Sequence, residues 1–136
     1  MGTALSPPAN PLISIVDDDE ESREALTLLT RSLGFKVDAF ASAAEFLAAP
    51  ALAQTACLIA DINMPGMTGV ELHRQLMTTG HPIPTILITA YPDDSVRDRA
   101  LDAGVVAYLS KPCAETTLLG CVRAALVPDK PERDPS

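Results

Sequence analysis

The chain has 136 residues, of which 47% are hydrophobic, and its formal net charge is −8 with 10 basic residues. This composition is typical of one folded domain with a buried core. No apolar run approaches the ~20 residues of a membrane helix and no signal-peptide pattern opens the chain, which predicts a cytoplasmic protein outside the membrane. Because binding to nucleic-acid phosphates requires clustered Lys and Arg, the scattered basic residues predict no direct nucleic-acid binding.

Three cysteines are spread irregularly along the chain, at Cys57, Cys113 and Cys121. An odd number without a CxxC pair, far from both histidines, indicates neither a disulfide framework nor a zinc site. We therefore predict reduced thiols that pack as small apolar side chains.

Five short apolar runs alternate with segments of helical periodicity. The predicted strands are residues 12–16, 35–40, 57–60, 83–89 and 105–110. The predicted helices are residues 22–33, 42–50, 68–80 and 93–103, with a last helix through 118–126. Proline-rich, polar or charged ends predict a disordered leader over residues 1–11 and a disordered tail or linker stub over 128–136, around a folded domain of residues 12–127.

The predicted strands are mostly apolar, as expected for a parallel sheet that helices cover on both faces. The strand at 35–40 alternates apolar with polar residues, which is typical of a sheet edge. Right-handed crossovers then place the first and third strands side by side, near a topological switch point. We therefore predict an α/β fold.

Four strands end at a chemically reactive or charged residue. Asp17 and Asp18 follow the first strand, Asp61 the third, Thr89 ends the fourth and Lys111 follows the fifth. The carboxyl ends of parallel strands share one edge of a sheet, so we expect three carboxylates, a hydroxyl and an ammonium to converge there.

Clustered carboxylates repel one another, and a hard divalent cation relieves the repulsion. Mg²⁺, with Mn²⁺ as an alternative, is the expected ion, and Lys111 and Thr89 suit the oxygens of a phosphoryl group. The chain has no Gly-rich phosphate loop and no histidine near the cluster to act as a base. Asp61 is therefore the best candidate nucleophile, although a carboxylate in this position can also be a simple helix or turn cap.

Four segments together carry a family signature. They are Val16-Asp17-Asp18, residues 61–69 (Asp-Ile-Asn-Met-Pro-Gly-Met-Thr-Gly), Ile88-Thr89-Ala90 and Tyr108-Leu109-Ser110-Lys111-Pro112. Over residues 12–127 the chain resembles the receiver domain of two-component response regulators, and FixJ-type receivers in particular. The resemblance implies a flavodoxin-like (βα)5 three-layer sandwich with a parallel sheet of order 2-1-3-4-5.

The resemblance also implies a role for each site residue. Asp61 would accept a phosphoryl group from a sensor histidine kinase or a phosphotransfer protein. The metal would be held by Asp17, Asp18, Asp61 and the carbonyl of Asn63, and the phosphoryl group by Thr89, Ala90 and Lys111. Thr89 and Tyr108 would form the switch, Asn63 and Tyr91 would tune the phosphate lifetime, and a cis bond would precede Pro112.

The family's usual interaction face comprises residues 93–103, 105–110 and the last helix, and a phosphorylation-dependent homodimer through it is an open possibility. Cys113 replaces the large apolar residue usual in FixJ-type receivers, which predicts looser packing behind Tyr108.

We predict a switch and not an enzyme acting on an external substrate. Two alternatives stay open: a flavodoxin-like cofactor-binding domain, and an aspartate-nucleophile phosphatase. Consecutive aspartates after the first strand argue against the former, and Asn63, where a second acid is expected, argues against the latter.

Overall fold

The computed structural model describes residues 11–127. Its strands are β1 (Leu12–Val16), β2 (Lys36–Phe40), β3 (Thr55–Asp61), β4 (Thr85–Thr89) and β5 (Ala107–Ser110). Its helices are α1 (Glu20–Ser32), α2 (Ala43–Ala48), α3 (Gly69–Thr78), α4 (Asp94–Asp102), α5 (Glu115–Leu126) and the 3₁₀ helix η2 (Pro50–Gln54). None of these helices has the length and apolar content needed to span a bilayer. The predicted leader, apart from Pro11, and the predicted tail over 128–136 lie outside the described residues.

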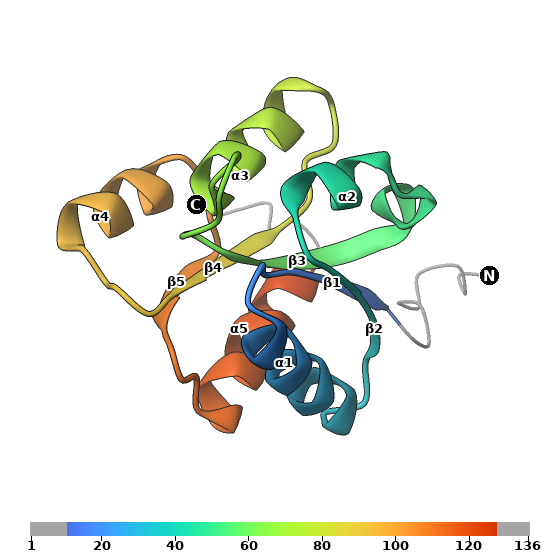
Figure 1. The fold of residues 1–136 in the computed structure, drawn as a ribbon. Helices are drawn as coiled ribbons and strands as arrows, with labels where there is room; N and C mark the ends of the chain where they lie inside the picture. The colour runs from blue at the N-terminus through green and yellow to red at the C-terminus, as the bar shows by residue number, and fades with distance from the viewer. Residues whose placement is uncertain (1–10, 128–136) are drawn as a thin grey trace, which may run out of the picture.

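The five strands form one sheet of order β2-β1-β3-β4-β5, and every neighbouring pair is parallel. Figure 1 shows α1 and α5 on one face of this sheet and α2, α3 and α4 on the other. The predicted three-layer α/β fold and strand order are therefore confirmed, and β2 is an edge strand as its polar pattern predicted.

The core consists of two apolar layers, one on each face of the sheet. Along β3, Leu58 and Ala60 belong to the layer beneath α2, α3 and α4, whereas Cys57 and Ile59 belong to the layer beneath α1 and α5. Successive side chains of a strand point to opposite faces, so a strand covered on both sides must be apolar throughout. This requirement explains the uninterrupted apolar runs within β3, over residues 56–60, and within β4, over residues 86–88.

Several element boundaries differ from the predictions. β4 begins at Thr85 and not at residue 83, since Pro84 has no N–H for the ladder, although its carbonyl accepts a hydrogen bond from the Leu58 N–H at 2.9 Å. β5 likewise begins two residues later than predicted, whereas β3 is longer at both ends and includes Asp61. Helix η2 was not predicted, because so short a helix leaves no periodic pattern.

The cysteines are free and lie among the apolar residues on the α1 and α5 side of the sheet. Burial raises the pKa of Cys57 to about 12, so its thiol stays protonated. Cys113 packs on this side, whereas Tyr108 packs against the opposite layer. The expected loosening of the packing behind Tyr108 by Cys113 is therefore wrong, because the sheet separates the two residues.

Candidate functional site

The carboxylates predicted to converge do so at the carboxyl edge of the sheet. Oxygen atoms of Asp17, Asp18 and Asp61 lie within 4.8 Å of one another. Asp17 directly follows β1 and Asp61 ends β3, and these strands are neighbours in the sheet. Asp17 is 0% exposed and Asp61 is 5% exposed, whereas Asp18 is open to solvent. The cluster therefore combines two buried carboxylates with one at the surface.

The first turn of α1 holds Asp17 in place. The Ser22 hydroxyl donates to Asp17 Oδ2 at 2.7 Å, and the backbone N–H of Asp19 donates to Oδ1 at 3.0 Å. The Arg23 guanidinium donates to the Asp17 carbonyl at 2.8 Å. Sequence reasoning missed Ser22 and Arg23, although their place in the first helical turn after the acids was a usable signal. The donors from Ser22 and Asp19 stabilise a carboxylate that water does not reach, whereas Arg23 fixes the backbone of the same residue.

Lys111 joins the two buried carboxylates. Its Nζ lies 3.0 Å from Asp17 Oδ2 and 3.5 Å from Asp61 Oδ2. Burial disfavours the charged ammonium, but the two ion pairs outweigh this effect and raise the pKa of Lys111 above its ordinary value. The Lys111 N–H donates to the Thr89 carbonyl at 2.8 Å, and the Lys111–Pro112 peptide bond is cis. A fully charged ammonium is therefore fixed beside both acids.

The pKa of Asp61 is raised above its ordinary value by its surroundings in the cluster. Burial and the Asp17 carboxylate raise the pKa of Asp61, while Lys111 and the Asn63 N–H, 3.3 Å from Oδ1, offset part of the increase. One ammonium thus faces two buried carboxylates and a third nearby. Several carboxylate oxygens with excess negative charge match the oxygen ligands that Mg²⁺ takes in proteins. The donor set therefore fits a hard divalent cation.

The loop between β3 and α3 brings the start of α3 against Asp61. Thr68 caps α3 in a complete capping box with Glu71, as predicted. A Cβ atom on Gly69 would lie only 2.5 Å from the Asp61 carbonyl oxygen, so only glycine fits this approach. Gly66 has a φ of 80°, which also favours glycine. Sequence reasoning used Gly69 only as part of the helix start and missed its contact with Asp61.

Thr89 lies at the end of β4 and is 1% exposed. Its hydroxyl donates to Asn63 Oδ1 at 2.6 Å and accepts a hydrogen bond from the Tyr91 N–H at 2.9 Å. The side chain of Tyr91 itself is 75% exposed, and Ala90 lies exposed between the two. The structure thus brings Thr89 and Asn63 together and leaves the Tyr91 ring at the rim.

Tyr108 lies apart from the carboxylates. Its hydroxyl accepts from the Asp93 N–H at 2.9 Å and donates to the Asp93 carbonyl at 3.3 Å. Asp93 is the N-cap of α4, and its carboxylate accepts from the N–H groups of Ser95 and Val96. The half-buried Tyr108 ring therefore connects β5 to the beginning of α4.

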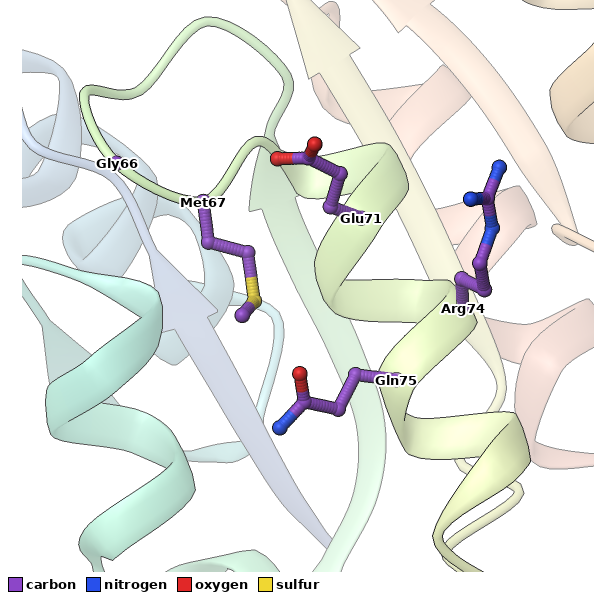
Figure 2. Close-up of a pocket in the computed structure, with 5 residues that line it drawn as sticks. All are labelled: Gly66, Met67, Glu71, Arg74 and Gln75. Carbon is purple, nitrogen blue, oxygen red and sulfur yellow. The ribbon is translucent and has the colours of Figure 1, made fainter.

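A hollow of about 480 Å³ beside α3 contains none of the residues predicted for the site. It is lined by Gly66, Met67, Glu71, Arg74 and Gln75. Figure 2 shows Met67 and Gln75 pointing to one side of α3 and Arg74 to the other. The hollow therefore lacks the three clustered carboxylates and the ammonium of the acidic cluster, and we take the cluster as the candidate site.

Comparisons with known proteins agree on one family. A family model described as the response regulator receiver domain matches residues 13–123. Response regulator protein TodT of Pseudomonas putida is 43% identical over 115 residues, which cover 85% of this chain and 51% of TodT. Among solved structures, response regulator StyR has a TM-score of 0.78 at 42% identity, over 87% of this chain and 60% of that one. FixJ-N has a TM-score of 0.77 at 34% identity, over 86% and 94% of the two chains.

These similarities concern the matched region, since the chain spans about half the length of TodT. The same region contains the parallel sheet and the acidic cluster. The resemblance to FixJ-type receivers noted in the sequence is confirmed by FixJ-N. The chain therefore belongs to the response regulator receiver domain family.

Proposed function

We propose that Asp61 accepts a phosphoryl group from a phosphohistidine of a sensor histidine kinase or phosphotransfer protein. The observation that supports this assignment is the environment of the Asp61 carboxylate at the end of β3. It lies with two other carboxylates and 3.5 Å from the Lys111 ammonium. Such a site favours charge neutralisation and positioning, which dominate phosphoryl transfer.

In the transfer step, an Asp61 carboxylate oxygen forms a bond to phosphorus while the phosphorus–nitrogen bond to the donor histidine breaks. The imidazole leaves with the electron pair of that bond and takes up a proton. Lys111, held between Asp17 and Asp61, neutralises charge on the phosphoryl oxygens. The Thr89 hydroxyl and the backbone of Ala90 contact the other oxygens. The domain works as a switch and does not turn over an external substrate.

Asp17, Asp18, Asp61 and the carbonyl of Asn63 are the residues proposed to hold Mg²⁺ or Mn²⁺, which would supply positive charge next to the transferred group. The three carboxylates on their own have only one ammonium as a counter-charge. Burial and the Asp17 carboxylate both raise the pKa of Asp61, and metal binding is therefore expected to lower it by adding positive charge beside the carboxylates.

The output face proposed is α4-β5-α5. Movement of Thr89 toward the phosphoryl group would vacate volume for the Tyr108 ring, whose hydroxyl now contacts Asp93 at the start of α4. Arg97 pairs within α4 with Asp94 and Asp98, each at 3.2 Å. These exposed pairs are weak, so they can be exchanged for pairs across a phosphorylation-dependent homodimer.

The exposed Tyr91 ring and the Asn63 side chain are the proposed regulators of phosphate lifetime. Both lie at the rim, where a water molecule would approach Asp61 for hydrolysis. A bulky Tyr91 favours a longer lifetime, so Tyr91→Ala is expected to hydrolyse faster.

The decisive experiment is incubation with Mg²⁺ and acetyl phosphate, followed by intact mass measurement. The expected result is one added phosphoryl group on the wild-type chain and none on Asp61→Asn. Asp102→Asn is the matched control, because Asp102 is exposed on α4 outside the cluster. Equal phosphoryl uptake by Asp61→Asn, or uptake that does not depend on Mg²⁺, contradicts the proposal.

A further inference from the structure

The Thr89 hydroxyl has a single proton, and that proton is committed to Asn63. A hydroxyl donates one hydrogen bond and accepts up to two. The donor bond goes to Asn63 Oδ1 at 2.6 Å, and one acceptor position is filled by the Tyr91 N–H at 2.9 Å. The hydroxyl is therefore held from both sides, and it cannot also donate to a group on Asp61.

We infer that the side chain of Asn63 is a resting-state latch that opposes switching by holding the Thr89 proton away from Asp61. This inference rests on the proposed function, in which Thr89 donates to the phosphoryl group. It assigns the amide of Asn63 a role separate from its backbone carbonyl, which is proposed for the metal. Asn63 is a positioning residue in this scheme, since it acts through Thr89.

The two acceptors that compete for the Thr89 proton differ in charge. The Asn63 amide oxygen is neutral, whereas phosphoryl oxygens are anionic, and hydrogen bonds to ionised acceptors are about twice as strong. Phosphorylation therefore supplies the better acceptor and draws the hydroxyl away. The released amide of Asn63 is exposed at the rim, so water can replace its lost hydrogen bond. Breaking the Thr89–Asn63 hydrogen bond therefore costs little free energy once the phosphoryl group offers a stronger acceptor.

The location of the latch explains how the rim can influence the buried switch. Asn63 and Thr89 belong to different strand ends and are 26 positions apart in the chain, but their side chains meet directly. Thr89 is nearly inaccessible to solvent, whereas Asn63 is exposed. Removal of the Asn63 amide therefore changes the resting energy of the Thr89 conformation, and because Asn63 is exposed the substitution leaves the buried core in place. The bond biases a population of two states and does not forbid either one.

The test uses beryllofluoride as a phosphoryl mimic, because it does not undergo hydrolysis and so separates switching from phosphate lifetime. At saturating Mg²⁺, Asn63→Ala is expected to bind beryllofluoride about 2- to 10-fold more tightly than the wild type, the factor expected for one net hydrogen bond. The same substitution in a Thr89→Val background is expected to change the affinity by less than about 2-fold, since no hydroxyl is left to hold. Gln75→Ala removes an exposed amide from α3 and serves as the matched control with unchanged affinity.

A second readout needs no mimic. In the unliganded protein, loss of the latch frees the Thr89 hydroxyl, so the Tyr91 amide that donates to it should exchange faster with solvent in Asn63→Ala than in the wild type. Failure of the wild type to bind beryllofluoride would refute the proposed function. Wild-type binding with an unchanged or weaker affinity in Asn63→Ala overturns the latch. An equal gain in both Thr89 backgrounds, or unchanged Tyr91 exchange, overturns it as well.

Discussion

Gly69→Ala tests whether the close approach of α3 to Asp61 requires glycine. The new Cβ would lie 2.5 Å from the Asp61 carbonyl oxygen and 3.1 Å from Leu87 Cδ2. Ordinary contacts begin at 3.4 Å, so the atoms would overlap by about 0.9 Å. The obstacle is the backbone of β3, which is hydrogen-bonded on both sides within the sheet and cannot rotate away as a flexible side chain could.

The expected destabilisation follows from two opposing effects. Forcing a methyl group into a packed site costs roughly 1–3 kcal/mol, whereas replacing glycine by alanine in a helix gains at most about 1 kcal/mol and less at its first position. The overlap with backbone puts this case toward the upper part of that range. We therefore expect a net loss of about 1–3 kcal/mol, or roughly 4–12 °C in Tm for a domain of this size.

Gly120→Ala provides the matched control, because it makes the same change in a helix where nothing lies within 4 Å of the new Cβ. This variant should gain about 0.4–1 kcal/mol, since alanine loses less backbone entropy on folding. Urea unfolding of both variants at neutral pH measures the change in the free energy of unfolding, which should be negative for Gly69→Ala and positive for Gly120→Ala. If Gly69→Ala is as stable as the wild type, or gains as much as Gly120→Ala, then glycine is not required by the contact with Asp61.

Three further predictions concern the charges and the switch. The raised pKa of Asp61 means that its ionised form lowers folding stability above about pH 4. Asp61→Asn should therefore raise the urea midpoint at pH 7 in the absence of metal, and this gain should vanish below about pH 4. Equal midpoints of the variant and the wild type at pH 7 contradict this prediction. Lys111→Met leaves the buried Asp17 carboxylate without its 3.0 Å ion pair and should cost about 1–3 kcal/mol, recovered in part by added Mg²⁺; full stability in metal-free urea titrations would refute it. Tyr108→Phe removes both hydrogen bonds to Asp93, so amide exchange by NMR should be faster at Asp93; an unchanged rate excludes Tyr108 as the anchor of α4.

The layers of the fold could be predicted because their signals are local. An apolar run such as that in β3 indicates burial on both faces, and the alternation in β2 indicates an edge. The capping box at Thr68 marked the start of α3 for the same reason. Where a local signal was absent or ambiguous, the prediction failed: η2 was missed, and β4 began after Pro84 and not before it.

The contacts within the site could not be predicted, because they join side chains that are far apart in the chain. Lys111 and Asp17 are 94 positions apart, and Asn63 and Thr89 are 26 apart. The sequence indicated that their strand ends would meet at one edge, but not which rotamers would pair. The hydrogen bond between Asp93 and Tyr108 could not be predicted either, because no local sequence pattern near either residue indicates it.

The sequence by itself determined which residues reach the carboxyl edge of the sheet, because strand periodicity and parallel topology place every strand end there. Only the tertiary structure decided how they share charge and protons: Lys111 lies between two buried carboxylates, and Thr89 donates to Asn63 and not toward Asp61. Strand placement follows from many weak local preferences that agree. A hydrogen bond between two side chains depends instead on the packing of all the elements that carry them.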